Sequence, residues 1–183
     1  MTDKQLPSPE LLRQLLQYEP ETGTLFWLER PSSMFSTVQA ANAWNSRFNN
    51  KTALNGIGNH GYRCGQIFGR TYLAHRVIWA LQTEAWPAEE IDHINGDPLD
   101  NRWGNLRAAT KTENMRNRRC QRGSTSKYLG VYWNSNAAKW QAQIGFRYIG
   151  SFVCEIEAAK AYDAAAVRLY GEFAKPNFPA NHF

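Results

Sequence analysis

The sequence predicts an α+β protein composed of two small modules that follow one another along the chain. Residues 90–119 have the pattern of a strand, a turn-rich loop, a second strand and a helix, and three strands and one helix are expected beyond residue 128. A chain of 183 residues has room for one medium domain or two small ones. We therefore expect a lead-in region over 1–84, a central module over 85–119, a linker over 120–127 and a C-terminal module over 128–178.

The lead-in region begins with a predicted helix. Ser8 and Pro9 are suited to the N-cap and first turn, and leucines follow with helical spacing at positions 11, 12, 15 and 16. The other elements expected there are a strand over 22–28, a loop or weak helix over 31–50, two short strands within 61–73 that turn at Gly69-Arg70, and a helix over 74–83.

The central and C-terminal modules have clearer local signals. The turn formers Asn95-Gly96 and Asp97-Pro98 separate a strand that ends at Asp92-His93 from one that begins at Leu106. Thr110 and Glu113 have the spacing of a capping box, which starts a helix. The C-terminal module is expected to contain strands near 129–133, 139–145 and 147–153 and a helix over 155–170 that ends at Gly171 and buries Ile156, Ala159, Tyr162, Ala166 and Leu169.

The net charge of +5 is concentrated in one part of the chain. Residues 92–127 contain eight Lys and Arg against four Asp and Glu, whereas the flanking segments are close to neutral. A local basic excess is typical of a phosphate-binding surface, although a solvated basic face has the same composition. Charge alone thus leaves nucleic-acid binding open.

The three cysteines are far apart and form no CxxC pair, so we expect neither disulfides nor a structural zinc site. The N-terminus lacks the pattern of a signal peptide, and no apolar run approaches the ~20 residues of a membrane helix. We therefore expect a cytosolic protein, with no membrane and no obligate protein partner.

Four residues of the central module have the chemistry of a phosphodiester-cleaving site. Asp92 and Asn114 offer a carboxylate and an amide oxygen, which are hard ligands suited to Mg²⁺ or Mn²⁺. His93 can accept a proton from water near neutral pH, and Asn105 could brace the loop and fix the ring. Because adjacent strand residues face opposite ways, Asp92 and His93 can share a site only if the strand ends or twists there.

This constellation resembles the HNH endonuclease family, in the form common in phage and intron-encoded enzymes. The resemblance implies a ββα-metal fold in which Asp92 and Asn114 bind the metal, His93 is the general base and Asn105 braces the site. It extends over about residues 18–119, including Leu73-Ala-His-Arg-Val-Ile-Trp. A calcium loop of the EF-hand type is excluded, because Ile94 and Gly96 stand at ligand positions.

Other polar residues near this segment have less specific signals. His75 either meets the scissile phosphate or satisfies a hydrogen bond in the core, and we expect the second. Five arginines are expected to contact phosphates, with one or two of them only solvated: Arg102, Arg107, Arg116, Arg118 and Arg119.

The C-terminal module resembles the ethylene-response-factor (Apetala-type) DNA-binding domain, through Lys127-Tyr-Leu-Gly-Val-Tyr-Trp, Lys139-Trp-Gln-Ala-Gln-Ile and the segments up to Asn177-Phe178. The resemblance implies a three-stranded antiparallel sheet in the major groove, packed on one helix. The alternation agrees, since Trp140, Ala142 and Ile144 can face the helix while Gln141 and Gln143 face outward and hydrogen-bond base edges.

The DNA contacts expected in this module are Lys127, Tyr132, Asn134, Lys139, Gln141, Gln143, Arg147 and Tyr148. Plant members usually place Arg where this chain has Leu129, Tyr132 and Asn134, so the charge-driven part of recognition is weakened. A small sheet-plus-helix domain that binds protein instead is the alternative for this module.

The sequence as a whole predicts a metal-dependent HNH endonuclease, of which a homing-type enzyme is one form, that docks on double-stranded DNA through its C-terminal module. The rival from another class is a non-catalytic, sequence-specific DNA-binding transcription regulator whose nuclease half has become scaffold.

Overall fold

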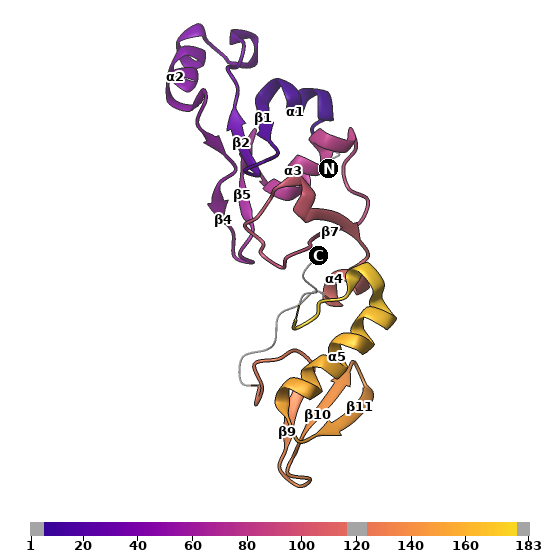
Figure 1. Cartoon of the computed structure of the whole chain (residues 1–183). Helices are drawn as coiled ribbons and strands as arrows, with labels where there is room; N and C mark the ends of the chain where they lie inside the picture. Colours follow the sequence, from indigo (N-terminus) through magenta and orange to yellow (C-terminus); the bar gives the residue numbers. More distant parts are fainter. Residues whose placement is uncertain (1–5, 117–123, 179–183) are drawn as a thin grey trace, which may run out of the picture. The chain divides into compact units, whose positions relative to one another are not determined.

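The computed structural model describes residues 6–116 and 124–178, and the chain divides into two compact units, Met1–Ala108 and Ala109–Phe183. Both units combine helices with small antiparallel sheets, so the α+β class is confirmed (Figure 1). The finer ranges expected from the sequence remain predictions. Within the described ranges, no helix is long and apolar enough to cross a membrane.

The first unit contains three α-helices and most of the short strands of the described chain. Its helices are α1 (Pro9–Leu15), α2 (Val38–Phe48) and α3 (Ala74–Thr83), with 3-10 turns η1 (Ser32–Met34) and η2 (Trp103–Asn105). Its strands are β1 (Leu16–Glu19), β2 (Thr24–Trp27), β3 (Thr52–Ala53), β4 (Gly56–Ile57), β5 (Arg63–Ile67), β6 (Arg70–Leu73), β7 (Glu90–His93) and β8 (Leu106–Ala109), the last of which reaches the boundary.

Local signals set the ends of these elements as predicted in several places. The Ser8 hydroxyl accepts a hydrogen bond from the Leu11 N–H at 3.2 Å, and Pro9 begins α1. Helix α3 buries Val77, Ile78 and Leu81 against the core, as the helical spacing of these residues predicts. The sheet order is β1-β2-β3, β4-β5-β6 and β7-β8.

Three expectations for the lead-in region need correction. Leu16 does not continue the first helix: it begins β1, which pairs with β2 and buries Leu16 in the same core. Residues 38–48 form a full helix, capped by the Thr37 hydroxyl, where only a loop or weak helix was expected. The turn of the next hairpin is made by Phe68 and Gly69, one residue earlier than predicted.

The second unit consists of α4 (Lys111–Arg116), β9 (Val131–Asn134), β10 (Lys139–Ile144), β11 (Arg147–Phe152), α5 (Glu155–Tyr170) and η3 (Gly171–Phe173). The strands form one antiparallel sheet of order β11-β10-β9, and α5 packs on its inner face. This unit has its own core, in which Val131, Ala142 and Ile144 of the sheet meet Ala159 and Tyr162 of the helix.

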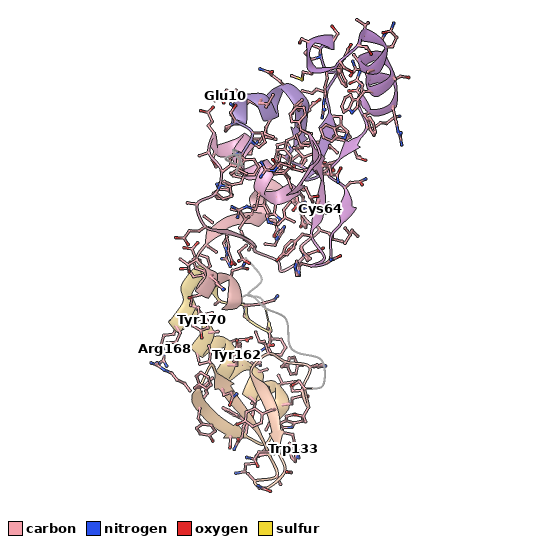
Figure 2. All side chains as sticks on the ribbon, turned by 180° about the vertical axis from the view of Figure 1, so that it is seen from behind. Glu10, Cys64, Trp133, Tyr162, Arg168 and Tyr170 are labelled. Atoms are coloured by element: carbon pink, nitrogen blue, oxygen red, sulfur yellow. The ribbon has the colours of Figure 1, made fainter. Side chains whose placement is uncertain are left out.

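The face that α5 buries agrees with the predicted stripe at its centre and differs at its ends. Ala159, Tyr162 and Ala166 are buried as predicted, together with Ala158, whereas Ile156 and Leu169 are 46% and 40% exposed. Small side chains allow the helix to lie close to the sheet, and Tyr162, labelled in Figure 2, is the largest of the buried residues of α5. A Cβ at Gly130 would lie 2.1 Å from the Tyr162 ring, so this close packing requires glycine there.

Candidate functional site

The end of strand β7 carries the two central residues of the predicted site. Asp92 and His93 are both buried, at 3% and 4% exposure, and His93 is the last residue of the strand. The chain then turns at once, with the Gly96 N–H donating to the His93 carbonyl at 2.7 Å. The strand thus ends directly after His93, and the meeting of the two side chains in one site remains a prediction.

The His93 ring is fixed by Asn101. The Asn101 Oδ1 accepts a hydrogen bond from His93 Nε2 at 2.9 Å. Because an amide oxygen can only accept, this contact places the ring proton on Nε2 and the lone pair of the neutral ring on Nδ1.

Asn101 is itself held by the lead-in region. It is 1% exposed, and its backbone carbonyl accepts a hydrogen bond from the Tyr18 hydroxyl at 2.9 Å. A Cβ on Gly23, which has a φ of +71°, would lie 2.4 Å from the Asn101 backbone. Burial raises the pKa of Tyr18 to about 12, so this hydroxyl stays a donor at neutral pH. The sequence analysis missed Asn101, because its role depends on contacts across 83 positions of the chain.

Asn105 braces the loop between β7 and β8. Its amide donates to the Asp100 carbonyl at 2.7 Å and to Asn95 Oδ1 at 3.1 Å, and its Oδ1 accepts from the Asn95 N–H at 3.0 Å. These contacts tie both ends of the loop together. The side-chain hydrogen bond to the His93 ring comes from Asn101, and not from Asn105 as expected.

The Asp92 carboxylate is paired with Arg107 on the neighbouring strand β8. Arg107 Nη2 and Nε donate to Asp92 Oδ2 at 2.7 and 2.9 Å, and both side chains are largely buried. The guanidinium predicted to contact phosphate therefore balances the charge of a predicted metal ligand. A buried carboxylate needs such a cation, because an uncompensated charge in the interior is costly.

His75, on α3, lies next to His93. The two ring centroids are 5.2 Å apart and nearly perpendicular, and His75 is 5% exposed. Burial, together with the neighbouring His93 and Arg76, lowers the pKa of His75 to about 3. Its Nδ1 has no hydrogen-bond partner among the described residues, so the expected core hydrogen bond is not formed at this atom.

Asp100 and Arg102 form an ion pair within the loop between β7 and β8. Arg102 donates from Nη2 and Nε to the Asp100 carboxylate at 2.6 and 2.8 Å. These bonds lower the pKa of Asp100 to about 2 and raise the pKa of Arg102. The Arg102 side chain is 57% exposed, so it can still present its outer edge to a phosphate.

A hollow of about 560 Å³ opens beside the loop. It is lined by Pro20, Glu21, Asn95, Arg102, Trp103, Gly104 and Asn105. The hollow thus places the bracing residue Asn105 and the exposed Arg102 on a common surface with the β1–β2 turn.

Asn114 and three of the predicted arginines follow β8. The predicted capping box is confirmed: the Thr110 N–H donates to Glu113 Oε2 at 2.8 Å, and the Glu113 N–H donates to the Thr110 hydroxyl at 3.3 Å. Asn114 lies in the helix that this box starts, in the second unit, and its approach to Asp92 remains a prediction. Arg116 ends α4, and Arg118 and Arg119 lie outside the described residues.

The donor chemistry fits a hard divalent ion held by few protein ligands. Asp92 supplies a buried carboxylate, a hard oxygen ligand whose charge Arg107 balances in this structure. Over residues 6–116 and 124–178, no group of three or more His, Cys, Asp or Glu is placed to hold a metal ion. Mg²⁺ does not need such a group, since it is commonly bound by one or two carboxylates with waters and phosphate oxygens.

The C-terminal sheet presents most of the residues predicted to contact DNA on its outer face. Strand pairing aligns Tyr132 with Gln141 and Gln141 with Ser151. Gln143 lies on the same face as Gln141 by alternation, and a bulge in β11, where Ile149 is the extra residue, places Tyr148 opposite it. Among the predicted contacts, Lys127, Lys139, Gln143, Arg147 and Tyr148 are exposed, and Tyr132, Asn134 and Gln141 are half-buried.

This outer face is internally ordered by hydrogen bonds. Gln141 accepts from the Tyr132 hydroxyl at 2.8 Å and donates to the Ser151 hydroxyl at 3.2 Å, and Ser151 also bonds Tyr148 at 2.8 Å. Ser151 was not predicted from the sequence, although its register opposite Gln141 marks it. Gln141 is therefore pre-oriented by its neighbours, whereas Gln143 is exposed.

Comparisons with known proteins agree with parts of this description. Residues 72–116 match the family model of HNH endonucleases. The chain is 32% identical over 124 residues to an uncharacterised HNH endonuclease, L560, of Acanthamoeba polyphaga mimivirus; the match covers 66% of this chain and 65% of that protein. It is 35% identical over 71 residues to Protein 3.8 of Escherichia phage T7, covering 38% of this chain and 59% of the phage protein.

A third relative is a plant transcription factor. The chain is 40% identical over 62 residues to the AP2-like ethylene-responsive transcription factor AIL7 of Arabidopsis thaliana, covering 31% of this chain and 12% of the plant protein. The chain thus spans less than two thirds of the length of each of these relatives. No solved structure matches.

The segment matched by the HNH endonuclease model begins just before α3 and ends with α4. It includes His75 and all four residues predicted for cleavage, namely Asp92, His93, Asn105 and Asn114. Residues 72–116 are therefore similar to the HNH endonuclease family at the segment that contains the candidate site.

Proposed function

We propose that the protein is a metal-dependent DNA endonuclease of HNH type that hydrolyses phosphodiester bonds. The observation that carries the proposal is the fixed, buried His93 ring at the end of β7, next to the buried carboxylate of Asp92. Both residues lie within the segment that matches the HNH endonuclease model. In this proposal the base and the hard ligand act on one phosphate, which requires the backbone to twist at the end of β7 so that the two adjacent side chains face the same site.

In this proposal, His93 Nδ1 takes a proton from a water molecule, and the resulting hydroxide attacks the phosphorus. Asn101 keeps the ring oriented throughout, because the Nε2–H bond to Oδ1 strengthens when the ring becomes positively charged. A divalent ion held by Asp92 and Asn114 would supply positive charge that stabilises the phosphate and the leaving oxygen. Asn105 keeps the loop closed around these groups.

The Asp92–Arg107 pair suggests that Arg107 orients the Asp92 carboxylate, in place of or in addition to contacting phosphate. Two guanidinium nitrogens bond the same carboxylate oxygen, Oδ2, and so fix the direction of the Asp92 side chain. A substitution that removes Asp92 therefore also leaves a largely buried arginine without this partner. Asp92→Asn is the better test of the ligand role, since it keeps a polar oxygen close to Arg107.

We propose in addition that the second unit docks the enzyme on double-stranded DNA through the outer face of its sheet. An ordered row of polar side chains on an antiparallel sheet suits base-edge contacts in the major groove. The likeness to a plant AP2-like factor supports this use of the sheet. The proposal also includes that the enzyme is of homing type and that its metal ion is Mg²⁺ or Mn²⁺.

The direct test is cleavage of supercoiled plasmid by the full chain, followed on agarose gels with and without Mg²⁺ or Mn²⁺. Nicked or linear plasmid that appears only with metal supports the proposal. With Asp92→Asn, the metal titration should move to higher concentration. Cleavage that does not depend on metal would contradict the metal site, and DNA binding without any cleavage would assign the chain to the non-catalytic DNA-binding class.

A further inference from the structure

A second hollow of the first unit is lined by aromatic rings. It has a volume of about 570 Å³, within the ~300–1,000 Å³ typical of small-molecule sites, and includes none of the residues proposed for cleavage. Its apolar walls are Trp27, Trp44, Phe48, Leu54 and Phe68, and its polar atoms come from Arg30, Thr52, Asn55, Cys64 and Gln66. Cys64, labelled in Figure 2, places the hollow beside strand β5.

Arg30 lies in this hollow as a buried cation. Its guanidinium carbon is 3.9 Å from the centroid of Trp44, 4.8 Å from Trp27 and 5.2 Å from Phe68. The residue is only 7% exposed, and its backbone N–H and carbonyl are both bonded by the Asn45 side chain at 2.9 Å. The cation is thus held firmly among flat ring faces.

The charge of this guanidinium is not balanced by an acidic partner. Within the described parts of the chain, Arg30 forms no ion pair, and its Nε has no hydrogen-bond partner. Ring faces attract a cation but do not neutralise its charge, and a buried charge without a counterion is costly. Burial correspondingly lowers the pKa of Arg30. An anion in the hollow would balance the charge of this guanidinium.

Phe68 gives a second, independent indication of a ligand. It forms the β5–β6 turn with Gly69, and both residues have positive φ, +49° and +75°. Asn or Gly usually occupies such a turn, because a bulky residue is strained there. Yet the ring is 54% exposed while it lines the hollow. Strain that is kept at an exposed aromatic ring is typical of a binding residue.

We propose that this hollow binds a nucleotide of an unpaired DNA strand, with a phosphate oxygen on Arg30 and the base stacked on Phe68. Guanidinium groups bind phosphate through charge-assisted hydrogen bonds, and exposed aromatic rings stack bases of any sequence. The amides of Asn55 and Gln66 lie on the same lining and can meet the base edge. This site is additional to the cleavage residues and does not depend on catalysis.

The test uses the full chain and a single-stranded hexamer of thymidine nucleotides, with binding followed by tryptophan fluorescence and by calorimetry. Arg30→Met keeps the length of the side chain and removes its charge, and should weaken binding about tenfold or more. Arg47→Met is the matched control, because Arg47 is an exposed arginine of α2 that does not line the hollow. An equal loss of hexamer affinity in both variants would mean that the loss comes from the lower net charge of the protein, and would overturn the proposed site.

Phe68→Asn separates binding from folding. Asn suits a positive φ, so the melting temperature should stay the same or rise, while hexamer binding falls because the stacking ring is lost. Unchanged hexamer binding by this variant would contradict the proposal, even if Arg30→Met did not fold. Inorganic phosphate and free thymidine should each bind more weakly than the hexamer, and phosphate binding as strong as the hexamer would rule out a nucleotide site.

The proposed cleavage reaction and the proposed nucleotide site can be tested separately. His93→Ala should bind the hexamer as the parent does, because the hollow contains neither His93 nor its partners. A loss of hexamer binding in His93→Ala would place the strand at the cleavage site instead.

Discussion

The chemistry expected of His93 depends on a residue that sequence reasoning did not single out. The spacing of Asp92, His93 and Asn105 identified the segment, because turn signals and ligand types are local features. The fixing of the ring by Asn101 and the pairing of Asp92 with Arg107 depend on which side chains meet after folding. Turn-forming residues and metal-ligand residue types in the sequence do not show which side chains meet after folding. Arg107 was therefore expected to contact phosphate, because that is the commonest use of arginine in a nuclease.

Asn101→Ala should slow plasmid cleavage about 10–100-fold, as is usual when an outer partner of a functional histidine is lost. The hydrogen bond that sets the tautomer of His93 disappears, so the pH profile of cleavage should also change, which a purely structural effect would not cause. DNA affinity in gel shifts should stay within about twofold of the parent, since Asn101 is buried. An unaltered rate and profile would remove Asn101 from the site.

His75 should make the stability of the protein depend on acid pH. Its pKa is about 3 in the folded chain against about 6.5 in an unfolded one, so the unfolded state binds the extra proton between these values. The free energy of unfolding therefore falls as the pH drops below about 6.5, by up to ~1.4 kcal/mol per pH unit. His75→Gln should lose less of its melting temperature between about pH 7 and pH 5. Parallel losses in both proteins would show that His75 does not contribute.

Among the secondary-structure elements, three parts of the lead-in region support the loop between β7 and β8. Tyr18 of β1 bonds the Asn101 carbonyl, Gly23 of the β1–β2 turn touches the Asn101 backbone, and Arg63 of β5 donates to the Leu99 carbonyl at 3.3 Å. The lead-in region is therefore a support for the candidate site, and its resemblance to the lead-in of HNH proteins has a physical reason.

The same elements show what periodicity can predict and where it fails. Helices α3 and α5 were expected, because their apolar positions recur with a helical period. Strand β1 was hidden, since Leu16 extends the leucine pattern of α1 by one residue. The centre of the buried face of α5 was predicted, but Ile156 and Leu169 were wrongly added to it, because large apolar side chains carry a strong hydrophobic signal while the close packing uses small alanines such as Ala158.

Gly23→Ala should displace the loop that carries Asn101. The new methyl group would lie 2.4 Å from backbone atoms of Asn101 and Arg102, at a positive φ, so we expect a loss of about 2 kcal/mol or more together with slower cleavage. Gly104→Ala is the matched control, because Gly104 lies in the β7–β8 loop that carries Asn101 and nothing lies within 4 Å of its added Cβ. Equal melting temperatures and rates for the two variants would contradict this support.

For the molecule as a whole, each unit has its own core, and this determines what can be tested separately. Leucines of α1, apolar residues of α3 and Ile91 of β7 share the first core, whereas the second core contains only residues of the C-terminal sheet, its helix and their flanks. The second unit also closes on itself, because Asn177 bonds the backbone of Leu129 at 2.6 and 3.1 Å. The segment 124–183 therefore contains a complete hydrophobic core.

Residues 124–183 expressed alone should fold and bind duplex DNA without cutting it. Binding should weaken steeply with salt, as phosphate contacts release counterions. Replacing Gln141 and Gln143 together by Ala should flatten the preference between DNA sequences more than it lowers non-specific affinity, because base-edge amides discriminate while phosphate contacts position. Gel shifts on selected and scrambled duplexes test this. Absence of DNA binding by the folded fragment would support the protein-binding alternative.

The general-base role of His93 is the central claim, and one plasmid assay tests it most directly. Purified His93→Ala and His60→Ala proteins are compared with the parent on supercoiled plasmid in Mg²⁺, where His60 is an exposed histidine of the same unit. Loss of a general base typically slows a reaction about 10²–10⁴-fold, so we expect His93→Ala to leave the plasmid supercoiled while His60→Ala cuts it at the parent's rate. Nicking by His93→Ala at the parent's rate would contradict the account.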